Sequence, residues 1–227
     1  SANSNIKFIC GYNHIFTKCV VEGKKILKRK TIGKINSVSS YNMVHWGVIF
    51  KAHPWLKGPH DSYLGFYKKG GGSLCEHSHG LNLLIHFINF LKLGNIKKIK
   101  PSIYFNKSKR VNYDYANFIN FKTDKNIISN LIQDVVTSPS IKKMHFQGDK
   151  GSMEIILDFK KNLDAIVLKI KNTEKIMKFK KNRAQDFEGQ ADFISKELKK
   201  RKNSCRTIFN ESILTMKLIC TAFKLNK

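Results

Sequence analysis

GGGSLCEHSHGLNLLIHFINFLKLG, residues 70–94, is the stretch of the chain that decides its fold. Residues 74–92 within it are the clearest helical segment of the sequence, and Gly94 is a typical residue for ending a helix. Beyond this helix the pattern changes to short runs that favour strands. The predicted helix therefore marks the point where a mixed first part of the chain gives way to a sheet.

Seven strand-like runs follow the helix. They lie at residues 97–105, 113–122, 126–136, 141–147, 152–159, 164–170 and 175–180. Turn-forming residues at 137–139, 147–151 and 160–162 are among the breaks between them. Consecutive strands joined by short turns predict a meandering antiparallel sheet.

The segments on either side complete the predicted architecture. Before residue 70 we expect a buried strand at 6–11, a helix at 14–29, a long strand at 34–47 and an irregular stretch at 48–72; after the sheet we expect helices at 185–200 and 210–224. This order predicts an α+β fold, an open and largely antiparallel sheet with helices on one face. We expect residues 1–227 to form a single domain.

The bulk composition is that of a packed globular protein. Of the 227 residues, 41% are hydrophobic, and no uninterrupted apolar run approaches the roughly 20 residues of a membrane span. The first ten residues lack the pattern of a signal peptide, so we expect a cytoplasmic location. The five cysteines are odd in number and never spaced CxxC, which argues against a disulfide framework or a zinc site.

The formal net charge of +26 would attract anionic partners, and it allows two interpretations. One is nucleic-acid binding, and the other is a lysine-rich composition spread over solvated faces. Lysines far outnumber the five arginines, are distributed along the whole chain, and accompany no known nucleic-acid-binding motif. We therefore expect no nucleic-acid function and keep a basic RNA-binding protein as an alternative.

Six of the eight histidines lie between residues 45 and 86, so chemistry is expected there. The sharpest element is the segment 70–82, whose glycines allow a tight turn and a close approach to a ligand. The helix start that follows favours anionic or hydroxyl-rich groups. Glu76 and His79, three residues apart on the predicted helix, would share one face, where a carboxylate can orient an imidazole for proton transfer.

Structural alternatives exist for the same residues. Ser73 and Glu76 also have the spacing of a capping box, and His77 and His86 also fit a core or an interface. Residues two apart on a helix point in different directions, so His77 and His79 do not predict a metal site. The sequence contains no GxGxxG, GxxxxGK[ST] or GxSxG motif, so nothing in it is expected to bind a dinucleotide.

Several segments together resemble the Gfo/Idh/MocA oxidoreductases. FICGYNH at 8–14 is similar to the family's strand that leaves the nucleotide domain, often GYNHRF, and KTIGKI at 30–35 is similar to its G-x-I-G-x-I turn. The glycines at 70–72 followed by EHSHGLN at 76–82 resemble its GGG…D/E…SH…D helix. QDVVT at 133–137 and QGDKGSME at 147–154 resemble its late strands.

The resemblance implies a two-domain enzyme. An N-terminal Rossmann domain would carry GxGxxG, a catalytic lysine in an EKP-like motif, and NAD or NADP. The C-terminal domain would supply the substrate pocket, a catalytic histidine and an open sheet whose outer face pairs subunits. By position, His79 matches the family's acid/base histidine, Glu76 the acidic residue before it, and Asn82 a position where many members have aspartate.

Two departures from the family pattern affect these expectations. Ile15 replaces the common arginine of GYNHRF, which removes an expected contact to an anionic substrate. The Rossmann domain and its lysine are absent, so we expect a truncated protein, a split gene product or a domain that needs a separate Rossmann-domain chain. The chain alone is expected to bind no cofactor and to be inactive.

The function that these observations predict is the substrate domain of an NAD(P)-dependent oxidoreductase acting on a sugar or nucleotide-sugar hydroxyl. His79 and Glu76 would be catalytic. The candidates for substrate contact are Asn13, Trp55, His60, Tyr63, His77 and Asn82, with ordinary packing as the alternative for Trp55 and Tyr63. We expect a homo-oligomer through the open sheet face. The main alternative is a non-catalytic carbohydrate-binding or dimerisation module.

Overall fold

Eight strands form one open sheet in the order β2-β3-β4-β1-β5-β6-β7-β8. This computed structural model describes residues 7–182, 184–200 and 205–226. The strands are β1 (Ile35–Met43), β2 (Ile96–Lys107), β3 (Asn112–Thr123), β4 (Ile128–Asp134), β5 (Ile141–Gly148), β6 (Gly151–Lys160), β7 (Leu163–Ile170) and β8 (Thr173–Lys180). Every pair of neighbours is antiparallel except β1 and β4, which run parallel.

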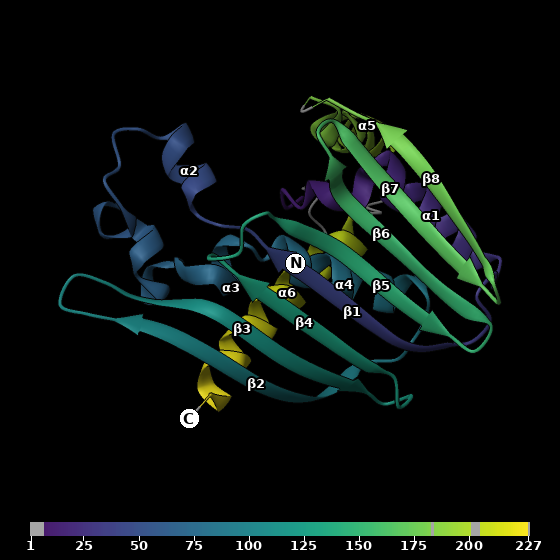
Figure 1. Ribbon diagram of the computed structural model, residues 1–227, viewed down its shortest axis with the longest axis horizontal. Helices are drawn as coiled ribbons and strands as arrows, with labels where there is room; N and C mark the ends of the chain where they lie inside the picture. The colour runs from purple at the N-terminus through teal and green to yellow at the C-terminus, as the bar shows by residue number, and fades with distance from the viewer. Residues whose placement is uncertain (1–6, 183, 201–204, 227) are drawn as a thin grey trace.

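The helices lie mainly on one face of this sheet, behind it in Figure 1. They are α1 (Lys18–Lys28), α2 (Gly47–Ala52), α3 (Gly72–Glu76), α4 (His79–Phe90), α5 (Gln185–Leu198) and α6 (Arg206–Leu225). Four short 3-10 helices are η1 (Asn13–Phe16), η2 (Pro59–Asp61), η3 (Tyr63–Gly65) and η4 (Tyr67–Lys69). The predicted fold class, an open and mostly antiparallel sheet with helices on one face, is confirmed.

Helix α4 is the centre of the covered face. It lies between the sheet, where it contacts β1 and β4, and helix α6. Residues 80–88 of the helix are all buried, which fits a helix that is apolar nearly all round. Two of its polar side chains have partners on α6: Asn82 Nδ2 donates to Thr215 Oγ1 at 3.1 Å, and His86 Nδ1 lies 2.8 Å from Glu211 Oε2.

The single helix predicted over 74–92 is wrong, because the chain forms two helices with a break at His77 and Ser78. The carbonyl of His77 accepts hydrogen bonds from Gly80 N at 3.0 Å and from Asn42 Nδ2 at 2.9 Å. A side chain that enters the backbone ladder in this way kinks a helix. Glu76 and His79 therefore lie on different helices and do not share a helical face.

The glycine turn that leads into α3 packs against other segments of the protein. Gly70 and Gly72 have φ of 87° and 81°, so the predicted tight turn is present. A Cβ on Gly72 would lie 2.0 Å from Asp114 Oδ1, and a Cβ on Gly71 would lie 2.1 Å from the carbonyl oxygen of Tyr63. The glycines were expected to let the backbone come close to a ligand. In the structure they let it come close to neighbouring segments of the chain.

Two further expectations differ from the structure. Residues 7–11 form no strand; they lie along α6, where the Phe8 and Phe209 rings stack at 5.3 Å. The strand expected over 34–47 ends at Met43, and the chain then turns into α2. The stretch from α2 to η4 projects from one side of the sheet in Figure 1; we call residues 47–69 the arm. A small cluster that includes buried Trp46, Leu64 and Tyr113 anchors it.

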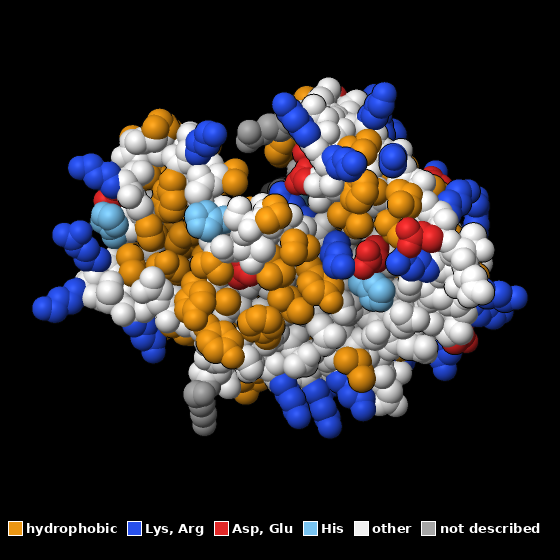
Figure 2. All heavy atoms as spheres, in the orientation of Figure 1, with side chains coloured by type: hydrophobic (Ala, Val, Ile, Leu, Met, Phe, Trp, Pro, Cys, Tyr) orange, Lys and Arg blue, Asp and Glu red, His pale blue; other side chains and the backbone are white. Residues whose placement is uncertain are grey.

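The other face of the sheet is covered by no helix among the described residues. Residues alternate between the faces, so that Ile119 is 2% exposed while its neighbour Phe118 is 44% exposed. Tyr104 lies beside Phe118 on this outer face, with ring centroids 6.1 Å apart. Figure 2 shows the apolar side chains gathered across it.

Candidate functional site

Three histidines lie near the N-terminal end of α4. The His79 ring meets the ring of Tyr12 edge-on at 5.2 Å and lies 4.7 Å from the ring of His14 on η1. His77, at the break before α4, has its Nε2 atom 3.2 Å from the carbonyl oxygen of Val44. We call His14, His77 and His79 the histidine cluster.

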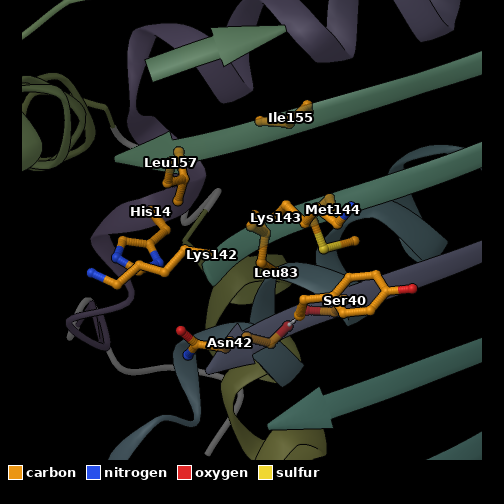
Figure 3. A pocket seen from close by; sticks show the side chains of 11 residues that line it. His14, Ser40, Asn42, Leu83, Lys142, Lys143, Met144, Ile155 and Leu157 are labelled. Atoms are coloured by element: carbon orange, nitrogen blue, oxygen red, sulfur yellow. Dashed lines mark hydrogen bonds between the residues drawn. The ribbon is translucent and has the colours of Figure 1, made fainter. Parts of the chain in front are cut away.

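Lys142 on β5 brings a positive charge to the histidine cluster. Figure 3 shows its side chain next to His14, beside a hollow of about 10 Å³ that also involves Asn42. Such a volume holds about one water molecule. The Lys142 ammonium group lies 2.9 Å from Asp158 Oδ2, and Asp158 also pairs with Lys181 at 2.9 Å. Burial alone would raise the pKa of Asp158, but these two lysines lower it to about 2.

All three histidines are held in the neutral form near pH 7. Burial lowers the pKa of His77 to about 4. Burial and the neighbouring His79 hold the pKa of His14 well below its usual range. Burial, and after it the Lys142 charge, also lower the pKa of His79. A neutral imidazole can accept a proton from a hydroxyl group.

The Nδ1 atom of His79 is buried and has no hydrogen-bond partner among the described residues. Buried polar atoms in folded proteins nearly always have a partner, so an exception calls for a water or a ligand group. His79 thus carries a hydrogen-bonding atom that is both buried and unused among the described residues.

A second polar pair lies where α3 faces the arm. The Tyr63 hydroxyl donates to Glu76 Oε2 at 2.8 Å. Burial, together with the Glu76 carboxylate, raises the pKa of Tyr63 to about 12. Ser73 and Glu76 do not form the capping box that their spacing allows. Ser73 Oγ has no partner among the described residues, and the backbone N–H of Leu74 donates to Asp114 Oδ2 at 2.7 Å instead. Glu76 therefore holds Tyr63, and no hydrogen bond joins it to His79.

The remaining predicted residues fall into two groups. Asn13 and Asn82 are buried, and their amides bond to the Asp186 carbonyl and to Thr215. Because these contacts occupy them in the interior, we do not include them in the candidate site. Trp55 and His60 lie on the arm, where Trp55 is 71% exposed and His60 pairs with Asp61 at 3.2 Å.

Sequence reasoning missed His14 and Lys142 as members of the site. A signal for Lys142 was present, because it precedes Met144 and Phe146 at spacings of two and four residues, and both of these face the helices. Period-two alternation would have placed this lysine on the covered face. His14 is part of the quoted FICGYNH segment but offers no local signal of its proximity to His79.

The glycine turn does not fit the phosphates of NAD(P). The volume beside Gly71 and Gly72 is filled by Tyr63 and Asp114, and the Asp114 carboxylate already accepts from the first turn of α3. Burial raises the pKa of Asp114 to about 6. Within the described ranges, no group of three or more His, Cys, Asp or Glu residues is placed to hold a metal ion. The described residues also include no helix long and apolar enough to cross a membrane.

The comparisons with solved structures find similar folds. A protein from Thermotoga maritima assigned as an oxidoreductase superposes with a TM-score of 0.71 at 14% identity, over 97% of this chain and 61% of that one. KijD10, a 3-ketoreductase from Actinomadura kijaniata solved with TDP-benzene and NADP, gives 0.68 at 10% identity, over 92% and 58%. An inositol dehydrogenase homolog from Azotobacter vinelandii, solved with NAD+, gives 0.54 at 14% identity, over 76% and 43%.

These structures are Gfo/Idh/MocA-type oxidoreductases, and the predicted resemblance to that family is confirmed at the level of the fold. The chain spans about 60% of the length of the first two. No family model matches the sequence, and no curated protein matches it.

The neutral histidine cluster predicts a pH dependence of stability. An unfolded histidine takes up a proton near pH 6.5, whereas folded His77 does so only near pH 4. At His77 the unfolded state therefore binds more protons in this window, and this difference lowers the free energy of unfolding as the pH drops from about 6.5 to about 4. For His77→Asn this fall should be smaller by about 2–3 kcal/mol, as measured by urea unfolding at several pH values.

The exposed His53, changed to Asn, provides the matched control for loss of one imidazole. The carboxylates with lowered pKa values, Glu154 and Asp158 at about 2, act mainly below this window. Asp114, whose pKa is raised to about 6, takes up its proton in the folded state within the same window and so opposes the histidines. The test is therefore the difference between variants: a His77→Asn protein whose stability falls as steeply with pH as that of the wild type would contradict burial of a neutral His77.

Proposed function

We propose that this chain is the substrate-binding part of an NAD(P)-dependent oxidoreductase that acts on a hydroxyl group of a sugar or nucleotide-linked sugar. The observation that carries the proposal is the unpartnered Nδ1 atom of His79 within a neutral histidine cluster at the start of α4. The fold shared with oxidoreductases that were solved with NADP or NAD+ supports it.

In this proposal His79 moves the proton of the reacting hydroxyl. As a neutral base it accepts the proton when the alcohol is oxidised. In the opposite direction, its lowered pKa makes the protonated imidazole a strong acid towards the oxygen of a ketone. Lys142 favours the second direction, because its charge disfavours the imidazolium form.

The arm and α3 would hold the rest of the sugar. The Tyr63 hydroxyl and the Glu76 carboxylate present a donor and acceptors suited to neighbouring hydroxyl groups. Trp55 offers an exposed aromatic surface on the arm, with His60 also on the arm.

The nicotinamide cofactor would be held by a nucleotide-binding domain, encoded with this chain or separately. We propose that the domain docks over the hollow of about 680 Å³ between residues 10–12 and α6. Its apolar lining includes Ile213 and Met216, which are 38% and 42% exposed. Tyr12 lines the same hollow and its ring contacts that of His79, so a domain seated there would meet a neighbour of the proposed proton-transfer group.

A substitution of His79 tests the proposed role. In the protein joined with its nucleotide-binding domain, His79→Asn should lower the rate of sugar oxidation by about 10²-fold or more, the range for loss of a general acid/base. His145→Asn, on the outer face of the sheet, is the matched control. An unchanged rate in His79→Asn, with the fold intact by circular dichroism, would remove His79 from the mechanism.

We also propose a homo-oligomer through the outer face of the sheet. Large apolar side chains stand exposed there, including Tyr104 at 48% and Phe118 at 44%. A contiguous apolar surface of this kind is typical of an interface, and a twofold axis pairs one such face with its copy. The net charge opposes close association, so it should be screened by salt in any test.

The oligomer is tested by its mass in solution. Sedimentation equilibrium of the wild type at micromolar concentration and high salt should give at least a dimer. Phe118→Lys, which places a charge in the buried interface, should shift the mass to the monomer, whereas Phe187→Lys on α5 should not. A monomeric wild type under these conditions overturns the proposal.

A further inference from the structure

A third hollow lies at the end of the sheet where β1 begins, and nothing in the proposed function uses it. Its volume is about 880 Å³, within the range of small-molecule sites. Its lining includes the apolar residues Leu27, Ile35, Phe90, Leu91 and Leu93. Leu27 and Ile35 belong to the buried core, so this floor is fixed by packing.

Lysines surround the apolar floor. They are Lys28, Lys30, Lys34, Lys92 and Lys150. Five of the twelve lining residues are thus lysine, whereas the whole chain has 42 Lys and Arg among 227 residues. Within the described part of the chain, none of the five forms an ion pair. The general basic composition does not account for this concentration of unpaired charge.

Some of these lysines have a structural explanation. Lys28 is in the last turn of α1, Lys30 follows that turn, and Lys92 follows α4, so each opposes the negative end of a helix dipole. Lys34 and Lys150 lie on turns outside both helices. The helix dipoles therefore do not explain why these two lysines lie at the hollow.

The two turns that carry Lys34 and Lys150 are joined by backbone hydrogen bonds. Asp149 N donates to the Lys34 carbonyl at 3.0 Å, and Lys150 N donates to the Ile32 carbonyl at 3.1 Å. The Asp149 carboxylate, an acid at this hollow, accepts from Lys34 N at 2.8 Å. The hollow is therefore preformed, and its acidic group is engaged with the backbone.

We propose that this hollow binds an amphipathic anion, a molecule with an apolar body and a phosphate or carboxylate head. The apolar body would lie on the floor around Leu91 and Leu93, and the head would meet the ammonium groups of Lys34 and Lys150. A nucleic-acid backbone would use the lysines but leave the apolar floor open to water, so the combination favours the amphipathic ligand. The hollow is roughly 20 Å along β1 from Asn42, which touches His77, so it is independent of the proposed catalytic function.

Calorimetric titration of the full chain with decyl phosphate, kept below its micelle concentration, tests the proposal. Decyl phosphate should bind at least about tenfold more tightly than inorganic phosphate, because only the former covers the floor. The double variant Lys34→Gln/Lys150→Gln should weaken binding by about tenfold or more. Lys175→Gln/Lys178→Gln, on the exposed strand β8, removes the same charge elsewhere and should change binding less than about twofold.

Two further binding experiments distinguish a lipid surface from a free molecule and test RNA as the competing partner. If vesicles of phosphatidylcholine containing phosphatidic acid bind through the same lysines, the head belongs to a lipid surface; if only soluble decyl phosphate binds, it belongs to a free molecule. The proposal is overturned if decyl phosphate does not bind or if both double variants weaken it equally. It is also overturned if poly-uridine RNA binds through Lys34 and Lys150 while decyl phosphate gains nothing over inorganic phosphate.

Discussion

The burial of helix α4 is the constraint on which the rest of the structure depends. A helix with so little polar surface needs apolar partners on opposite sides, and here they are the sheet and α6. The polar groups that it carries inward, Asn82 and His86, are matched by Thr215 and Glu211 on α6. Once α4 is held in this way, its first residue, His79, is placed against Tyr12 and His14.

Local patterns were sufficient for most of the fold. The seven strand runs after residue 95 and both C-terminal helices were predictable, because each is set by its own periodicity and by turn residues at its ends. The place of β1 was not predictable from such patterns. It pairs with β4 and β5, about 90 and 100 residues further along the chain, and only long-range packing selects those partners. The break before His79 has the same origin, because it depends on Asn42 of β1.

The candidate site was predictable only in part. His79 and Glu76 could be singled out from one segment, and Tyr63 from its neighbourhood, but their pairing could not. Glu76 binds Tyr63 because the break in the helix separates it from His79. His14 and Lys142 come from segments 65 and 63 positions away from His79, so their proximity is a property of the tertiary fold. The glycine turn was predicted at the right place but with the wrong role. Its pattern is typical of ligand binding, whereas here it allows the backbone to pack against Asp114.

The most direct test of the account is to observe the histidine rings by NMR during titration with a nucleotide-linked sugar. With dTDP-glucose added to the full chain, the account predicts that the ring resonances of His79 and His14 shift together. His145, on the outer face of the sheet, should stay unchanged at the same concentrations. If the His79 resonances do not move while dTDP-glucose binds elsewhere, or if no resonance moves at millimolar ligand, the assignment of this end of α4 as a sugar site is contradicted.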